Sequence, residues 1–207
     1  SPYETAVHWH GIRLDNRFDG VPGVTQDPVP PGGSFRYQVY FKDAGIYWYH
    51  PHHREDVQQE LGLYGNLLVE SLDPDYYGPS DREEILMLDD ILLDDSGLVE
   101  FGEGSSNYML MGRFGNVPLV NGEPRYVLAV EDGEVVRFHL TNASNTRTFN
   151  LSFIANKWYD VHMKGVADPL KEAGDGRLPI KVVASDVSKF EREEWVESVV
   201  IAPAERY

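Results

Sequence analysis

The chain has 207 residues, of which 42% are hydrophobic and 25% are charged, as in an ordinary globular protein of one or two domains. Its net charge of −16 argues against nucleic acid as a partner, because phosphate binding depends on Lys and Arg. The chain has no cysteine, which excludes disulfides, thiolate zinc sites and cysteine nucleophiles, and no apolar run of roughly 18 residues that would predict a membrane span.

Short alternating segments separated by turn residues make up the first third of the chain. Strands are predicted over residues 5–14, 34–41, 46–49 and 64–70, with a proline-glycine turn at 29–33 and a helical turn at 57–63. The strict alternation of apolar and polar residues makes 34–41 a clear strand prediction.

The rest of the chain continues in the same manner. Further strands are predicted over 84–90, 126–130, 135–140, 148–153, 181–184 and 198–201, with a glycine-rich loop at 97–115, turns at 120–122 and 174–177, and a short helix at 189–195. Many short strands without a long amphipathic helix indicate an all-β sandwich or barrel.

Two of the predicted strands each carry a pair of histidines separated by one residue: His8 with His10, and His50 with His52. Residues i and i+2 of a strand point to the same face, so each pair directs two imidazoles to one side of a sheet. Four neutral imidazoles from two strands form a transition-metal site, suited to copper, zinc, iron or nickel. The alternative is that the pattern recurs by chance on strands that face solvent.

The residues around these histidines resemble the multicopper oxidases, the family that includes laccase and ascorbate oxidase. The similar segments are 8–11 (HWHG), 19–26 (DGVPGVTQ), the turn Pro31-Gly32, 45–52 (GIYWYHPH) and 62–70 (GLYGNLLVE). Segments 120–122, 133–144 and 202–207 are similar to the middle domain of the same family. The order and spacing of these pieces agree with the family.

The resemblance implies two cupredoxin-like Greek-key β-sandwich or barrel domains, both incomplete. The first would occupy residues 1–71, a linker 72–82, and the second 83–207. The family's third and fourth histidine motifs and the cysteine that binds its type 1 copper have no counterpart here. The chain is therefore expected to be an internal piece of a larger oxidase, or one of several fragments.

The resemblance also assigns roles to residues. His8 would bind the type 2 copper, and His10, His50 and His52 would bind the coupled type 3 pair. Asp19 matches an acidic residue that lies near the cluster and helps to supply protons, which is reasonable because oxygen reduction consumes them. Asp19 could instead be a turn residue before glycine, or could orient a ligand imidazole.

The function implied for the complete protein is a copper-dependent oxidoreductase that oxidises phenols, aromatic amines or metal ions and reduces O₂ to water, outside the cytoplasm. The expected partners are O₂, a small reducing substrate, and either another copy of the chain or the remainder of the oxidase. A non-catalytic copper-binding or structural β module is the alternative. Copper nitrite reductase, which shares the fold, is disfavoured because it needs a cysteine-bound copper.

Three further histidines lie outside the two pairs. His53 follows His52 directly, so it should point to the opposite face of the strand and lie on an exposed loop. His139 has no histidine partner nearby and is expected to be a surface or core residue. His162 and Met163 could bind cuprous ion as a soft pair.

Overall fold

The computed structural model describes residues 2–101, 106–155, 176–186 and 188–207. Strands predominate, as the sequence predicts. The strands are β1 (Val7–His10), β2 (Gly45–Pro51), β3 (Gly65–Val69), β4 (Arg82–Ile91), β5 (Leu93–Asp94), β6 (Gly97–Leu98), β7 (Val117–Val120), β8 (Val136–Asn142), β9 (Phe149–Leu151), β10 (Ile180–Ser185), β11 (Ser188–Val196) and β12 (Val199–Ile201). The helices are η1 (Asn16–Phe18), α1 (Glu55–Gln58) and α2 (Ser106–Met111).

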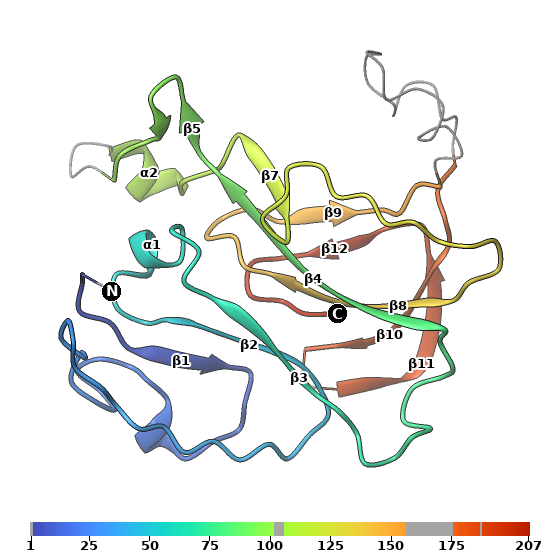
Figure 1. The fold of residues 1–207 in the computed structure, drawn as a ribbon, viewed down its shortest axis with the longest axis horizontal. Coiled ribbons are helices and arrows are strands. Elements are labelled where there is room, and N and C mark those ends of the chain that lie inside the picture. Colours follow the sequence, from blue (N-terminus) through green and yellow to red (C-terminus); the bar gives the residue numbers. More distant parts are fainter. Residues whose placement is uncertain (1, 102–105, 156–175, 187) are drawn as a thin grey trace.

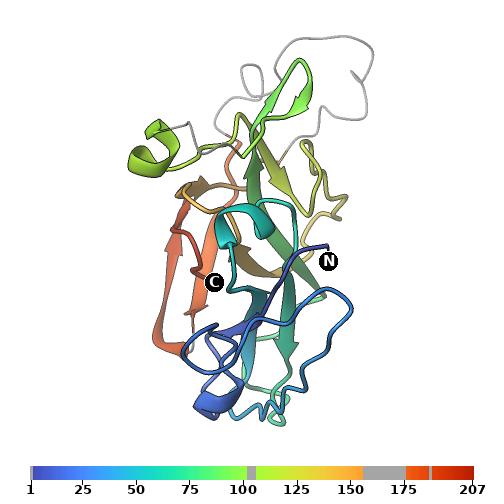
Figure 2. The ribbon, with the colours of Figure 1, turned by 90° about the vertical axis from the view of Figure 1, so that its left-hand side faces the viewer.

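Two three-stranded sheets form the centre of the molecule (Figure 1). One has the order β1-β2-β3 and is antiparallel. The other has the order β7-β4-β8, in which β4 runs parallel to β8. Three two-stranded sheets, β9–β12, β10–β11 and β5–β6, complete the strand pairing of the described residues. The β5–β6 hairpin and α2 project from the end of the molecule opposite β1 and η1 (Figure 2). Along the described residues, no helix has the length and apolar character needed to cross a membrane.

The apolar core lies on β4 and the strands around it. Leu86, Leu88, Leu140 and Ile201 form one fully buried cluster. Since β4 has a strand on each side, its second half is buried almost without interruption. A second cluster, of Trp48, Met87 and Ala143, packs β2 against the β4–β8 sheet. Strand β2, which carries His50 and leads into His52, is therefore supported by the second half of the chain.

Most of the predicted strands are present. Those predicted over 46–49, 64–70, 84–90, 135–140, 148–153, 181–184 and 198–201 occur with ends that differ by a few residues. The strand predicted over 5–14 is shorter, because Gly11 has a φ of 84° and the extended conformation stops at His10. The helical turn predicted at 57–63 begins earlier, at Glu55.

The prediction of a strand over residues 34–41 is wrong. This segment belongs to no ladder of the described residues. Instead of pairing, the segment contacts β1 through the side chain of Tyr37. The Tyr37 ring packs on Trp9, with ring centroids 5.5 Å apart, and the Tyr37 hydroxyl accepts a hydrogen bond from the Val7 amide at 3.0 Å. A side-chain hydroxyl thus satisfies the β1 amide that a paired strand would have bonded.

Three predictions in the second half also differ from the structure. Residues 126–130 are not a strand, and Val127 and Val130 are about half exposed. The expected loop at 97–115 contains β6 and α2. The helix predicted at 189–195 is the strand β11, since Asp186, at a φ of 48°, turns the chain back and β11 pairs with β10. The turn at 174–177 lies partly outside the described residues.

A buried polar junction also links the two halves of the chain. Tyr64, just before β3, donates its hydroxyl to the Asp89 carboxylate on β4. Glu60, just after α1, accepts hydrogen bonds from Arg113 Nε at 3.2 Å and from Asn145 Nδ2 at 3.2 Å. Asp89 is 7% exposed, and this burial raises the pKa of its carboxyl to about 6.

This raised pKa predicts a specific pH dependence of stability. Between pH 3.8, the ordinary carboxyl value, and about 6, the folded chain holds a proton at Asp89 that the unfolded chain has lost. Protonated Asp89 therefore stabilises the fold at low pH, and this contribution is lost as the pH rises through 6. The loss lowers the free energy of unfolding by on the order of 3 kcal/mol. Urea unfolding from pH 4 to pH 7 should show a smaller decline of unfolding free energy for Asp89→Asn than for the wild type.

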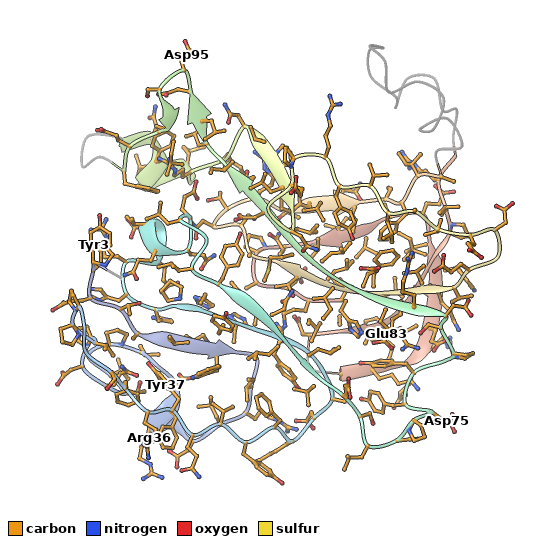
Figure 3. All side chains as sticks on the ribbon, viewed as in Figure 1. Tyr3, Arg36, Tyr37, Asp75, Glu83 and Asp95 are labelled. Carbon is orange, nitrogen blue, oxygen red and sulfur yellow. The ribbon has the colours of Figure 1, made fainter. Side chains whose placement is uncertain are left out.

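The matched control is Asp95→Asn, an exposed carboxylate at the tip of the β5–β6 turn (Figure 3). It should keep the wild-type pH slope. Equal slopes in the wild type and the Asp89→Asn variant would contradict the assignment.

Candidate metal centre

The four paired histidines meet on one face of the β1–β2 ladder. Antiparallel pairing places His8 opposite His50 and His10 opposite Trp48. Because the members of each pair are two residues apart, both pairs project to the same side. The sequence expectation that two neighbouring strands bring four imidazoles together agrees with this register.

The imidazole rings lie close enough to share bound metal. The His8 ring centroid is 5.5 Å from that of His10, 5.3 Å from that of His50 and 5.4 Å from that of His52. Ring nitrogens of His8, His10 and His50 lie within 4.8 Å of one another. His52 is outside this tighter group, with its Nδ1 placed 3.2 Å from the Glu55 carboxylate on α1.

Main-chain carbonyl groups orient two of the rings. The His8 Nδ1 lies 2.8 Å from the carbonyl oxygen of Asp19, and the His50 Nδ1 lies 2.9 Å from that of Pro51. A carbonyl oxygen only accepts, so each Nδ1 carries a proton, and in the neutral form of these rings the lone pair is on Nε2. A hydrogen bond of this kind is the usual means of fixing a metal-binding histidine.

Burial keeps the inner rings neutral. It lowers the pKa of His50 to about 4 and, with the positive charge of Arg206 as the next cause, the pKa of His10 to about 3. Both imidazoles are therefore unprotonated at neutral pH and can bind a cation without first losing a proton. Trp48, which is 1% exposed, stacks on both rings, with centroids 5.1 Å from His10 and 4.4 Å from His50.

Asp19 lies in a turn that packs against β1. Besides the main-chain contact to His8, its carboxylate Oδ1 is 3.4 Å from the same Nδ1. The next residue, Gly20, has a φ of 77°, and a Cβ there would lie 1.8 Å from the main-chain oxygen of Val7. Glycine therefore permits both the turn conformation and the close approach that brings Asp19 to His8. Asp19 is at once a turn residue and a neighbour of the cluster.

The remaining histidines lie apart from this cluster. His53 is 3.9 Å from the Glu4 carboxylate and has no contact with the four rings among the interactions of the described residues. His139 is 6% exposed, and its Nε2 lies 3.2 Å from the Glu83 carboxylate, so it is a buried core histidine. His162 and Met163 lie outside the described residues.

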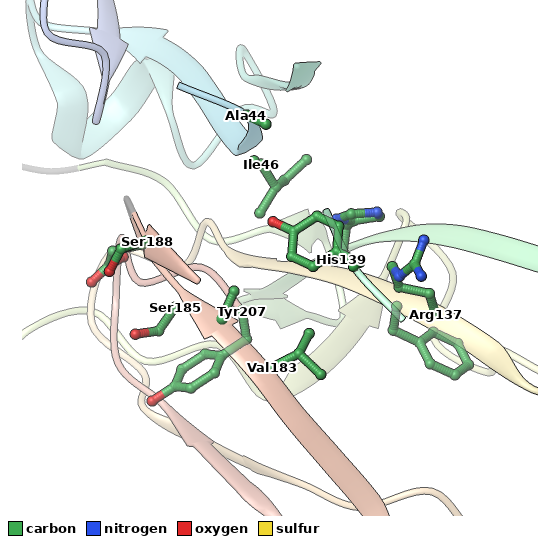
Figure 4. Close-up of a pocket in the computed structure, with 13 residues that line it drawn as sticks. Ala44, Ile46, Arg137, His139, Val183, Ser185, Ser188 and Tyr207 are labelled. Carbon is green, nitrogen blue, oxygen red and sulfur yellow. The ribbon is translucent and has the colours of Figure 1, made fainter. Parts of the chain in front are cut away.

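One small cavity opens where β2, β8 and β10 meet (Figure 4). Its volume is about 30 Å³, enough for a water molecule. It is lined by Ile46, His139, Ser185 and Tyr207, among others, and none of the four clustered histidines reaches it. The cavity is therefore no substrate pocket for the candidate metal centre.

Sequence patterns alone missed two residues beside the cluster. Glu55 contacts His52 from the first turn of α1, three residues further along the chain. Arg206 is 196 positions after His10 and carries no motif that would connect it with the histidines. Glu55 is close to His52 in sequence, so the tight turn between β2 and α1 brings the two side chains together.

Comparison with known proteins identifies the family. Residues 1–74 match the family model described as multicopper oxidase. Copper resistance protein A of Pseudomonas syringae pv. tomato is 41% identical over 86 residues, which are 42% of this chain and 14% of that protein. A laccase of Arthroderma benhamiae is 32% identical over 167 residues, which are 74% of this chain and 25% of that protein. The chain belongs to the multicopper oxidases.

A solved structure extends the likeness over the whole chain. The multi-copper oxidase of Pseudomonas thermotolerans matches with a TM-score of 0.75 and 29% identity, covering 100% of this chain and 44% of that one. The expectation of a cupredoxin-like all-β fold is confirmed. The chain spans less than half the length of each of these relatives.

Multicopper oxidases use copper as their cofactor, and the histidine cluster suits that metal. Its donors are imidazole nitrogens, which bind copper in both of its common oxidation states. Two of the nitrogens are oriented by carbonyl groups, and the rings of His10 and His50 are held neutral by burial. The donor set therefore fits copper, and the His50 Nε2 that would bind it lies 3.3 Å from His10 Nδ1.

The Asp19-Gly20 turn gives a prediction with an internal control. Gly20→Ala forces a Cβ into the Val7 carbonyl, whereas Gly23, also at a φ of 77°, has nothing within 4 Å of its Cβ position. Gly23→Ala should cost about 1 kcal/mol of unfolding free energy, and Gly20→Ala about 3 kcal/mol, with weaker copper binding as Asp19 moves from His8. Urea unfolding and copper titration measure both effects, and equal stability of the two variants would refute the close approach.

Proposed function

We propose that the chain carries half of the histidine ligands of an oxygen-reducing copper cluster, in a copper-dependent oxidoreductase of laccase type. The observation that supports this most directly is the convergence of four imidazoles on one face of β1 and β2 in a multicopper oxidase. Carried over by position, His8 binds the type 2 copper, and His10, His50 and His52 bind the type 3 pair.

The ions so bound would supply electron transfer from a reducing substrate to O₂, which is reduced to water. The protein side chains prepare the site for this chemistry. His8 and His50 present Nε2 because their Nδ1 protons are engaged by carbonyl oxygens. Trp48 fills the space beside His10 and His50 and limits the movement of both rings. Phenols, aromatic amines or metal ions are the proposed reducing substrates, with O₂ as the second partner.

Asp19 is the proposed proton-handling residue. Reduction of O₂ consumes protons, and a carboxylate near the site can hold and pass them. The Asp19 side chain is 33% exposed while its Oδ1 is 3.4 Å from His8 Nδ1, so it connects solvent with a ligand ring. Its role would be to accept a proton at the carboxylate from water and deliver it toward the cluster.

The complete enzyme requires residues beyond these 207. A type 1 copper needs a cysteine thiolate, and this chain has no cysteine. We propose that residues 1–71 and 83–207 are parts of two cupredoxin-like domains, joined by 72–82, and that they act with the rest of the oxidase or with another copy of the chain. The place of action proposed is extracytoplasmic.

The second candidate function is a copper-binding module without turnover. The same lack of cysteine favours it, because a chain with four histidine ligands and no type 1 site has no entry point for electrons. The two functions share the metal site and differ in whether a partner supplies the missing ligands. Phenol oxidation by the complete protein, compared with this chain alone, separates them.

Copper binding tests the site itself. The chain should bind copper stoichiometrically, and the double variant His10→Ala with His50→Ala should lose most of it, because two of the four imidazoles are removed. His53→Ala is the control, since His53 lies outside the cluster. Equilibrium dialysis with metal analysis gives the answer, and unchanged copper content in the double variant would falsify the assignment.

Colour and activity test the missing type 1 centre. The copper-loaded chain should lack the intense blue absorption that a cysteine–copper bond produces, and its oxidation of phenols should be very slow. Visible spectroscopy must be combined with the intact mass of the same sample. A blue sample with the mass of this sequence would contradict the account.

A further inference from the structure

Arg206 is a buried cation behind the histidine cluster. It is 3% exposed. Its Nη1 donates to the Asp186 carboxylate at 2.7 Å and to the Ala204 carbonyl at 3.1 Å, and its Nε donates to the Ile46 carbonyl at 3.4 Å. Its Nη2 is buried without a hydrogen-bond partner among the described residues. A residue near the end of the chain thus contacts the start of β2.

The free side of the guanidinium faces the end of β1. A Cβ placed on Gly11 would lie 2.3 Å from Arg206 Nη2 and 3.3 Å from the Tyr47 ring. Gly11 directly follows His10, so the guanidinium packs against the main chain next to that ring. The absence of a side chain at Gly11 is what gives Arg206 this place.

The positive charge of Arg206 is only partly neutralised. Asp186 is its one ion-pair partner among the described residues, and the Asp186 side chain is 44% exposed. A carboxylate in contact with water screens a buried cation less than a buried partner would. The positive charge of Arg206, next to the main chain that follows His10, is therefore incompletely offset by Asp186.

We propose that Arg206 is an electrostatic positioning residue for the copper site, which fixes the end of β1 after His10 and favours cuprous over cupric ion there. The inference rests on the proposed copper site. A cation next to the site repels a doubly charged ion more than a singly charged one, and the repulsion is strong because the guanidinium is buried. The fold thereby raises the tendency of the bound metal to accept an electron.

The affinities of the 207-residue chain for cuprous ion and for cupric ion, each measured by competition with a chelator, test the proposal. Arg206→Met should lower the ratio of cuprous to cupric affinity on the order of tenfold, because the charge is removed. Arg206→Lys should keep most of the wild-type ratio. The control Arg147→Met removes a guanidinium that pairs with Asp90, away from the cluster, and should leave the ratio unchanged.

Asp186→Asn tests the sign independently and covers the case in which Arg206→Met does not fold. It keeps a hydrogen-bond acceptor for Arg206, and Asn tolerates the φ of 48° at this turn. Loss of the counter-charge should raise the cuprous-to-cupric ratio. If Asp186→Asn and the wild type both bind copper with the same ratio of cuprous to cupric affinity, the role proposed for Arg206 is overturned, while the metal site itself is not. Absence of copper binding by the wild type would overturn the metal site, and this inference with it.

Discussion

The antiparallel register of β1 and β2 is the constraint on which the candidate site depends. With His8 opposite His50, the two histidine pairs share one face. A slip by one residue would turn one pair to the other face of the sheet and separate the four rings. No single side chain assembles the cluster; it is a consequence of backbone hydrogen bonds between two short strands.

Contacts from distant parts of the chain hold this register. Trp48, directly opposite His10, packs with Met87 on β4 and with Ala143, just after β8. Gln59, just after α1, donates from its Nε2 to the Ala143 carbonyl at 2.8 Å. On the outer side, the Asp19-Gly20 turn packs against Val7 and His8. The β1–β2 ladder that carries the histidines is thus packed on both sides, which limits the rearrangement needed to bind an ion.

Much of this arrangement could be predicted from the sequence because it follows local rules. Alternation within a strand places His8 with His10 and His50 with His52, and the resemblance to a known family assigned all four to one copper cluster. The buried strand β4 followed from its continuous apolar run. These features depend on neighbours only a few residues away.

The features that were missed depend on distant partners. Residues 34–41 alternate like a strand, yet Tyr37 uses its ring and hydroxyl on β1 instead of pairing. The charged segment at 189–195 has a helical composition, but the turn at Asp186 and the partner β10 impose a strand. Arg206 reaches Gly11 across nearly the entire chain, and no spacing rule could have connected them.

X-ray absorption at the copper edge of the copper-loaded chain tests the central claim most directly, because it reports the atoms bound to the metal. If β1 and β2 present their histidines as described, the spectrum should show imidazole nitrogens with the characteristic scattering of their ring carbons, and no sulfur. A surface with a net charge of −16 offers many carboxylates as competing ligands. Coordination by oxygen alone, without imidazole, would contradict the account.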